Sequence, residues 1–260
     1  MKKSFISMAM VLAIAAGAGE GKTVFAGSKA SQWRKYVSAA PESGVLQAAL
    51  PLPIRYGYPV FEVAPDKKYA ICGEFRLTEA GTQAQLEAGL LCIAANGKGI
   101  FPYNCLPLKN IPLGKLAAEA PAGSRSVTVS GIPELNAVKK NYLCLAFNAK
   151  EDESDLPNFE ISPFITVNGV KKQNGNLLIT LEKPLDKSFA ADTPVRIHTH
   201  GGVFVYAVRN QKLTSQWTVV RKVISGRQLR PGTVRAQMIF GVNGKGPGKV
   251  EFRNLQVIEL

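Results

Sequence analysis

From Tyr56 to the C-terminus, the chain is a succession of short apolar runs separated by turn residues. The runs are rich in Val, Ile, Leu, Phe and Tyr, and pairs such as Asn174-Gly175, Gly201-Gly202 and Asn243-Gly244 lie between them. Runs of this kind, bounded by residues that tolerate positive φ, are typical of β-strands and tight turns. Helical periodicity is sparse, and its best stretch, 82–88, is short. The pattern therefore predicts an all-β protein, an antiparallel β-sandwich of jelly-roll type.

The same pattern sets the expected domain organisation. Residues 27–55 mix Ser, Ala, Pro and scattered charge around two large side chains, Trp33 and Tyr36, and we interpret them as an N-terminal arm. Residues 56–260 then form one β-sandwich domain. A domain boundary at the acidic run 151–155 is the alternative, but an exposed loop explains this run more simply, because neither half would retain many strands.

The N-terminus has the three parts of a secretory signal peptide. Lys2-Lys3 precede the largely apolar stretch 5–16, and small residues follow at Ala16-Gly17-Ala18 and Val24-Phe25-Ala26. The apolar stretch is shorter than the roughly 18 residues that a membrane span requires, and no later segment is long enough to be a transmembrane segment. We therefore expect residues 1–26 to be a signal peptide and the protein to be exported, to the periplasm or the cell exterior.

Four cysteines, Cys72, Cys92, Cys105 and Cys144, follow the expected signal peptide. In an oxidising compartment they could form two disulfides, with three pairings open. Cys72, Cys92 and Cys144 also lie in apolar runs, where a free thiol acts as a small hydrophobic side chain. Their spacing does not match the paired Cys-x-x-Cys pattern of zinc sites, so we expect structural cysteines and no metal site. No cofactor is expected either, although the acidic run 151–155 leaves a structural calcium ion as the alternative to a solvated loop.

Positive charge is concentrated towards the C-terminus. The formal net charge at pH 7 is +13, and residues 195–260 contain eleven Lys and Arg but only two acids, a net charge of +9. Such a segment attracts polyanions. An exported protein meets anionic glycans and lipid head groups, so we expect no nucleic-acid partner. The alternative is a basic surface that only aids solubility.

One run in this basic segment has the residue types of an anionic-glycan site. Arg196, His198 and His200 would project from one face of a strand, because side chains alternate along it. After a turn at Gly201-Gly202, the returning strand would bring Tyr206 towards them. Arginine offers a planar fork to carboxylate or sulfate, and aromatic rings stack on sugars. The candidate ligand-binding residues are therefore Arg196, His198, His200, Tyr206, Arg209 and Trp217.

Two catalytic interpretations compete with simple binding at this run. A metal could bind His198 and His200 as in cupin-like enzymes, but that pattern places a Glu four or five residues further on, where this chain has apolar residues. A polysaccharide lyase could use the histidines and Tyr206 as base and acid while Arg196 neutralises a uronate. The chain has no Gly-x-Ser-x-Gly, His-Glu-x-x-His or phosphate-binding Gly-rich loop. We assign no catalytic residue and expect binding without catalysis.

Two segments near the ends of the expected domain carry a resemblance. Residues 61–76 read FEVAPDKKYAICGEFR, and residues 248–260 read GKVEFRNLQVIEL. The first resembles the strand, proline-containing turn and Tyr-initiated strand near the start of galactose-binding-like jelly-roll carbohydrate-binding modules, and the second resembles their closing strand. In that family the two strands are neighbours in one sheet. The resemblance implies a galactose-binding-domain-like sandwich that binds carbohydrate.

These observations predict an exported, non-catalytic carbohydrate-binding protein that recognises sulfated, sialylated or uronate glycans through its basic C-terminal third. A polysaccharide lyase or another glycan-active enzyme is one alternative. A cell-envelope adhesion or assembly component is the other, with another envelope protein as partner and exposed sheet edges as its binding surface.

Overall fold

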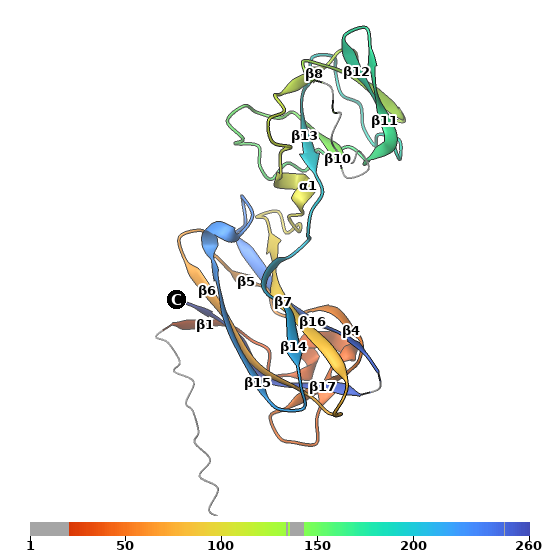
Figure 1. Ribbon diagram of the computed structural model, residues 1–260. Coiled ribbons are helices and arrows are strands. Elements are labelled where there is room, and N and C mark those ends of the chain that lie inside the picture. The colour runs from red at the N-terminus through yellow and green to blue at the C-terminus, as the bar shows by residue number, and fades with distance from the viewer. Residues whose placement is uncertain (1–20, 134, 136–142, 247) are drawn as a thin grey trace, which may run out of the picture.

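Strands make up most of the molecule. Figure 1 shows the computed structural model of the chain. The structure describes residues 21–133, 135, 143–246 and 248–260. All pairs of neighbouring strands in these ranges are antiparallel. Two of the three sheets contribute to one apolar core, so the predicted all-β class and antiparallel sandwich are confirmed.

Sheet A has the strand order β15-β6-β17-β3-β2, and β1 also pairs with β17. Its strands are β1 (Lys22–Ala26), β2 (Ser38–Ala39), β3 (Leu46–Ala49), β6 (Lys68–Leu77), β15 (Thr218–Ser225) and β17 (Lys249–Glu259). Strands β6 and β17 pair from Val250 opposite Leu77 to Glu259 opposite Tyr69. The two segments that carry the resemblance are therefore neighbours in one sheet, as predicted.

Sheet B has the order β14-β7-β16-β4, with β5 paired to β16. Its strands are β4 (Leu52–Tyr56), β5 (Phe61–Glu62), β7 (Gln83–Ile93), β14 (Val205–Leu213) and β16 (Arg235–Lys245). Strand β7 includes most of the stretch 82–88 that has the best helical periodicity. Its side chains alternate instead, since Ala84, Leu86 and Ala88 point into the core. The expected turn at Asn243-Gly244 is likewise part of a strand, β16.

Sheets A and B enclose the first core, in which aromatic rings are central. Trp33 and Phe240 have ring centroids 4.8 Å apart, and so do Phe240 and Phe252. Trp33 belongs to the 3-10 helix η1 (Ala30–Tyr36). Strands β3 and β4 pair with β17 and β16, so the interpretation of residues 27–55 as an arm is corrected. This segment is part of the sandwich, because Trp33 and four other apolar residues of the segment are buried in its core: Val37, Leu46, Ala48 and Leu52.

Sheet C surrounds a second core of its own, with the order β10-β13-β8-β9-β12-β11. Its strands are β8 (Gly114–Leu116), β9 (Ser126–Ser130), β10 (Leu143–Phe147), β11 (Ile165–Gln173), β12 (Asn176–Leu181) and β13 (Pro194–Thr199). Strands β11 and β12 form a hairpin whose predicted turn is confirmed. Asn174 has a φ of 50° and Gly175 a φ of 80°, the conformation that an Asn-Gly hairpin turn requires.

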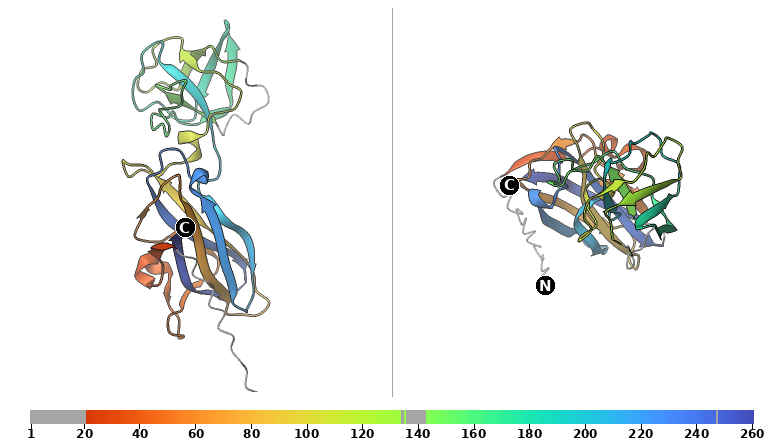
Figure 2. Two further views of the ribbon diagram at one scale, coloured as in Figure 1. Left: turned by 90° about the vertical axis from the view of Figure 1, so that its left-hand side faces the viewer. Right: turned by 90° about the horizontal axis from the view of Figure 1, so that it is seen from above.

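The second core is an insertion between β7 and β14 of the first. The chain leaves the sandwich after the short helix α1 (Pro102–Cys105) and returns after β13, and the two parts are distinct in Figure 2. The two crossings lie side by side, since the N–H of Thr199 donates to the carbonyl of Leu106 over 2.9 Å. The expected single sandwich over 56–260 is thus corrected to two cores, and Gly201-Gly202 lies in the connection between them rather than in a hairpin.

The beginning of the described chain is also folded. Residues 1–20, most of the expected signal peptide, lie outside the described residues. Strand β1 covers Lys22–Ala26 and pairs with β17, and Phe25 is buried against Trp33. Residues 22–26, at the end of the expected signal peptide, thus belong to sheet A, and the signal peptide over 1–26 stays a prediction. No helix in the described part of the chain is long and apolar enough to cross a membrane.

All four cysteines are free. Cys92, Cys105 and Cys144 are buried, and Cys72 is partly exposed. Burial raises the pKa of the Cys144 thiol to about 12. The structure thus favours the interpretation of these side chains as small hydrophobic groups over the two disulfides that export would permit.

Candidate functional site

The residues selected from the sequence lie in four separate places. Arg196 and His198 lie on β13 in sheet C, and both are buried. The Nη2 of Arg196 lies 2.6 Å from the Asp155 carboxylate, and its Nη1 donates to the Lys150 carbonyl over 3.0 Å. Both side chains therefore lie on the face of β13 opposite to Val195 and Ile197, which belong to the second core. His198 is fully buried, whereas Arg196 is 5% exposed and also lines an open pocket of about 620 Å³.

The neutral form of His198 is fixed by its two partners. Its Nε2 accepts from the Nε of Arg196 over 3.1 Å, and its Nδ1 lies 2.8 Å from the carbonyl oxygen of Tyr103. Guanidinium groups only donate, so Nε2 carries no proton and Nδ1 donates to Tyr103. Burial lowers the pKa of His198, and the positive charge of Arg196 adds to this effect.

His200 and Trp217 lie on different parts of the molecule. His200 is in the connection to β14, where its ring centroid lies 5.6 Å from that of Phe164. Trp217 precedes β15 and lies on sheet A, with the guanidinium carbons of Arg76 and Arg253 each 4.3 Å from its ring centroid. Trp217 is therefore on another sheet than the buried pair on β13, and the His200 ring lies beside the rings of Phe164 and Tyr103.

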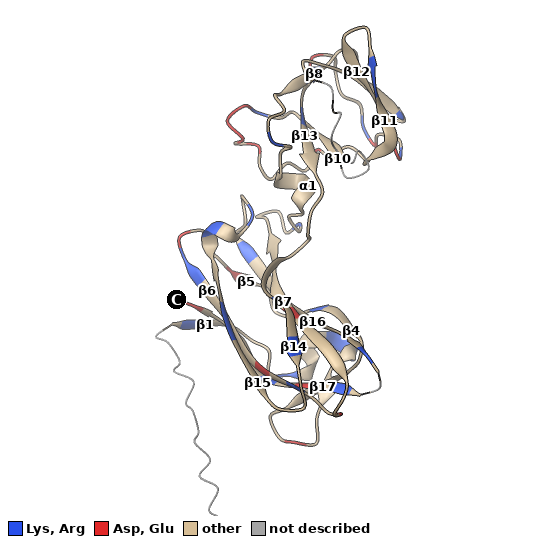
Figure 3. Cartoon of the chain, in the orientation of Figure 1, with Lys and Arg blue, Asp and Glu red and all other residues tan. Residues whose placement is uncertain are grey.

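The two arginines that contact Trp217 are neutralised by acids. Arg76 forms a 2.7 Å ion pair with Glu251, and Arg253 forms a 2.8 Å ion pair with Glu74. Hydrogen bonds to Glu251 are the main reason that the pKa of Arg76 is raised. The basic C-terminal third therefore does not form one positive face, and Figure 3 shows Lys and Arg on both parts of the molecule.

Tyr206 and Arg209 form the other pair of selected residues that remain together. Both lie on β14, and the guanidinium carbon of Arg209 is 4.9 Å from the Tyr206 ring centroid. Strand β14 pairs with β7 of sheet B, and not with β13 as the sequence suggested. Tyr206 belongs to the face of sheet B that points away from the first core, because its neighbours Val205 and Ala207 pack against that core. An irregularity in the register between Tyr206 and Val208 lets Val208 face the core as well.

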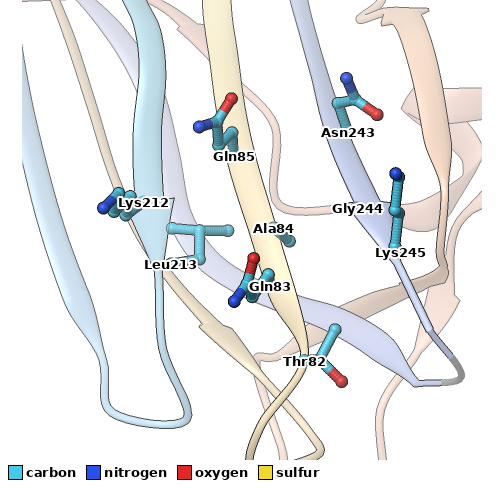
Figure 4. Close-up of a pocket in the computed structure, with 9 residues that line it drawn as sticks. All are labelled: Thr82, Gln83, Ala84, Gln85, Lys212, Leu213, Asn243, Gly244 and Lys245. Carbon is cyan, nitrogen blue, oxygen red and sulfur yellow. The ribbon is translucent and has the colours of Figure 1, made fainter.

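This outward face of sheet B contains an open groove of about 440 Å³. Figure 4 shows Gln83 and Gln85 on β7 between Lys212 on β14 and the pair Asn243 and Lys245 on β16. The complete lining is Thr82, Gln83, Ala84, Gln85, Lys212, Leu213, Asn243, Gly244 and Lys245. Amides and ammonium groups therefore dominate its polar surface.

The strand register arranges these polar side chains in rows across the sheet. Gln85 is paired with Lys212 on one side and with Asn243 on the other, and Gln83 is paired with Lys245. Residues in such register are neighbours about 5 Å apart on one face. The sheet thus presents donors and acceptors from three strands at fixed spacing, which a flexible loop would not do.

Aromatic side chains follow further along the same face. Gly89 is paired with Tyr206 and with Ile239, and Ile239 is paired with Tyr56. The rings of Tyr56 and Phe204 are 6.1 Å apart between centroids, and Phe204 lies 5.9 Å from Tyr206. Gly89 permits this arrangement, because a Cβ there would lie only 2.8 Å from the Cα of Tyr206.

Charge on this face is mostly positive. Glu87 projects outward from β7 between the amide rows and the aromatic rings, and it makes no ion pair within the described residues. Burial raises the pKa of the Tyr206 phenol, and the Glu87 carboxylate adds to the rise. Arg209 and Lys212 on β14 and Lys245 on β16 add three positive charges to this face.

The acidic run 151–155 is not fully solvated. Asp155 is buried against Arg196. Burial alone raises the pKa of this carboxyl, but hydrogen bonds from Asn158 and Arg196 outweigh burial and hold the pKa below its usual range. Within the described ranges no group of three His, Cys, Asp or Glu side chains could hold a metal ion.

Sequence reasoning missed most of this groove. Gln83, Gln85 and Asn243 belong to no motif, and amides are depleted in strands. Lys212 and Lys245 contributed only to the count of positive charges. The sequence does contain one indication of this face. Polar residues alternate with apolar ones along 83–88, a pattern that predicts a strand with one side facing solvent.

Comparison of the chain with models of protein families, with curated proteins and with solved structures finds no match. The resemblance of residues 61–76 and 248–260 to carbohydrate-binding modules therefore stays a prediction.

Proposed function

We propose that the protein is an exported, non-catalytic carbohydrate-binding protein that recognises anionic glycans in the groove of sheet B. The observation that carries this proposal is the row of Lys212, Gln85 and Asn243 across three neighbouring strands. The proposed groove does not include Arg196, His198, His200 or Trp217, which the sequence suggested as ligand contacts. Tyr206 and Arg209 remain candidate contacts on the same face.

The chemistry of the row suits sugars that carry acidic groups. Carboxamides of Gln85 and Asn243 each offer a donor and an acceptor, so each can bind neighbouring hydroxyls of one sugar ring. The ammonium groups of Lys212 and Lys245 attract sulfate or carboxylate groups without demanding one geometry. Tyr206 adds an aromatic face beyond Glu87, on which the apolar side of a sugar can stack.

Binding without turnover fits the same residues. A glycosidase requires two carboxyl groups across the scissile bond, whereas the described residues that line the groove include no carboxyl group. The lyase alternative required Arg196, His198, His200 and Tyr206 in one site. The first two are buried in sheet C and Tyr206 lies on sheet B, so that constellation is not assembled.

The proposal also includes the fold family and the export of the protein. The pairing of β6 with β17 supports a jelly-roll sandwich of the galactose-binding-like kind, and the signal-peptide pattern at residues 1–20 supports export. An exported protein would meet sulfated, sialylated or uronate polysaccharides at the cell surface.

A glycan array with matched variants tests this function. We expect selective binding to anionic glycans, and about ten-fold weaker binding for the double variant Gln85→Ala, Asn243→Ala, because two hydrogen-bonding groups contribute about 0.5–1.5 kcal/mol each. The control is Gln173→Ala, Gln256→Ala, which removes two amides from sheets C and A. Equal affinities of the two double variants, or no glycan bound at all, would refute the proposal.

Salt dependence tests the anionic part separately. Raising the salt concentration should weaken binding, because exposed charges are screened beyond about 10 Å at 0.1 M. Lys212→Ala, Lys245→Ala should remove most of that dependence, whereas Lys171→Ala, Lys172→Ala on β11 changes the net charge equally and should not. A groove that binds neutral sugars with no dependence on salt would contradict the anionic assignment.

The free edge of β15 favours a second candidate, the envelope assembly component. β15 is the terminal strand of sheet A, so one side of its backbone has no neighbouring strand among the described residues. Val219 is 65% exposed and Val223 49% exposed on this strand, and Arg221 and Lys222 lie between them. An extended segment with acidic and β-branched residues could add to this edge.

A photocrosslinking residue at Val219 tests this second candidate. We expect a crosslink to one envelope protein from position 219, and none from Val167 on β11, which is 63% exposed. Val223→Asp should abolish the crosslink by opposing an acidic partner strand. Equal labelling at both positions would mean that no specific partner occupies the edge.

A further inference from the structure

The edge of β4 carries a cluster of aromatic and cationic side chains that the proposed groove does not include. We define this β4 patch as Arg34, Lys35, Tyr36, Arg55 and Tyr58. Tyr36 is 46% exposed and Tyr58 is 37% exposed. The patch comes from η1, from β4 and from the residues that follow β4. Large exposed aromatic groups beside cations are typical of a binding surface.

Each arginine of the patch is stacked on a tyrosine. The guanidinium carbon of Arg55 lies 3.5 Å from the Tyr36 ring centroid, and that of Arg34 lies 5.1 Å from the Tyr58 ring centroid. The Nη2 of Arg34 also donates to the Tyr58 hydroxyl over 2.6 Å. Stacking fixes the plane of a guanidinium while its N–H groups, which point outward in that plane, remain available to an oxyanion.

No carboxylate neutralises these arginines within the described residues. The Nε of Arg55 is buried and has no hydrogen-bond partner. Arg76 and Arg253 provide the contrast, because they are also stacked on an aromatic ring but are paired with Glu251 and Glu74. The β4 patch therefore has unused donors and uncompensated positive charge.

The backbone that presents Arg34 is held in place by its neighbours. Arg34 has a φ of 59°, which a non-glycine residue adopts rarely and only when its surroundings enforce it. Gln32 provides that constraint, since its amide nitrogen donates to the carbonyls of Ala26 and Tyr58. Trp33, between them, is buried and donates to the Gly27 carbonyl over 3.1 Å. The position of Arg34 is thus fixed before any ligand binds.

We propose that the β4 patch is a second anion-binding site, in which Arg34 and Arg55 bind sulfate or carboxylate groups of a polysaccharide. Tyr56, which adjoins Arg55 in sequence, belongs to the groove face through its pairing with Ile239. Side chains of β4 thus point to the groove and to the patch alternately, and a chain that crosses this edge contacts both. The identity of the ligand as a glycan rests on the proposed function, whereas the recognition of an anion does not.

Heparin and polygalacturonate, the sulfated and the carboxylated probe, test the patch. The variant is Arg34→Gln, Arg55→Gln, and the control is Arg125→Gln, Arg227→Gln, which removes two exposed arginines elsewhere. We expect at least ten-fold weaker binding of one or both probes by the patch variant. We also expect its affinity to depend less steeply on salt, because fewer ions are released on binding. Equal affinities of patch variant and control would overturn the proposal.

A second variant distinguishes a loss of binding from a loss of folding. Arg55→Lys retains the charge but not the planar fork, so we expect intermediate affinity at an unchanged unfolding midpoint. Full affinity in Arg55→Lys would contradict recognition by a stacked guanidinium. Tighter binding of single-stranded DNA than of heparin would overturn the glycan assignment and make the patch a nucleic-acid site.

The groove variant Gln85→Ala, Asn243→Ala separates this inference from the proposed function. If the groove variant binds both probes as the unmodified protein does and the patch variant does not, the groove proposal fails and the patch stands. If the groove variant loses affinity and the patch variant does not, the patch proposal fails and the groove stands.

Discussion

The guanidinium of Arg196 donates from its Nε to the Nε2 of His198 over 3.1 Å, on the buried face of β13 that points away from the second core. His198 can accept this bond only in its neutral form, and its other nitrogen is used by the carbonyl of Tyr103. Protonation of His198 would place two cations against each other in a buried position. Arg196 and His198, which the sequence suggested as ligand contacts, therefore stabilise the insertion. This stabilisation should be lost in acid.

Acid should destabilise the insertion through His198. Its pKa in the folded protein is below the usual value near 6.5, so the unfolded chain takes up a proton first as the pH falls. Stability is therefore lost as the pH drops below about 6.5, by at most about 1.4 kcal/mol for each pH unit. Urea unfolding at about pH 7.5 and about pH 5.5 measures the loss.

His198→Gln should remove this part of the pH dependence. His200→Gln is the matched control, because His200 is exposed on the connection and is the other histidine of the chain. Asp155 also has a lowered pKa, but its contribution is lost only near pH 4 and below, outside the measured range. An unchanged pH dependence in His198→Gln would mean that another group titrates.

The buried ion pair of Arg196 and Asp155 should matter far more than an exposed pair of the same length. Both Arg196–Asp155 and Lys115–Asp192 are 2.6 Å long, but their side chains are 6% and 8% exposed in the first pair and 60% and 73% in the second. Asp155→Ala leaves a buried cation without its partner and should cost about 3–5 kcal/mol. Asp192→Ala should cost less than 1 kcal/mol.

A double-mutant cycle completes this test. Arg196→Met with Asp155→Leu replaces both charges by apolar groups and should cost less than the sum of the single changes. Additive costs in urea unfolding would show that the two side chains act independently, against the geometry of the pair.

Excision of the insertion should leave the first core folded. Thr199 and Leu106 are joined by a 2.9 Å backbone hydrogen bond, and His198 lies opposite Pro107. An Asn-Gly turn can therefore replace residues 107–198 with little rearrangement of the flanking chain. We expect the shortened protein to unfold cooperatively and to retain the groove, as measured by circular dichroism and by its glycan affinity. Loss of folding would show that the two cores depend on each other.

The sequence predicted most strands because alternation and turn residues act locally. It predicted Asn174-Gly175 as a hairpin turn, and the positive φ values of both residues confirm it. It could not predict the insertion, because the strands of both cores have the same pattern and their separation depends on contacts between residues far apart in sequence. Gly201-Gly202 looked like a turn, although it connects two cores.

The same limit applies to the candidate site. Tyr206 and Arg209 were selected because their residue types are informative, and both lie on the groove face. Gln85 and Asn243 become neighbours only because β7 and β16 pair. The register of this pairing depends on the whole sheet, so the sequence could not predict it. Arg196 has the residue type of a ligand-binding group, yet burial against Asp155 gives it a structural role.

Under the proposed export, the first strand should decide where the mature protein begins. Strand β1 pairs with β17, and Phe25 packs on Trp33 with ring centroids 5.7 Å apart. A chain that starts at Gly27 lacks this strand, whereas cleavage after Ala18, at the earlier group of small residues, retains it. We therefore expect mass spectrometry of the exported protein to find an N-terminus near Gly19. In that form, Phe25→Ala should cost about 3–5 kcal/mol in urea unfolding. An exported protein that begins at Gly27 and equals the longer form in stability would show that β1 contributes nothing to the sandwich.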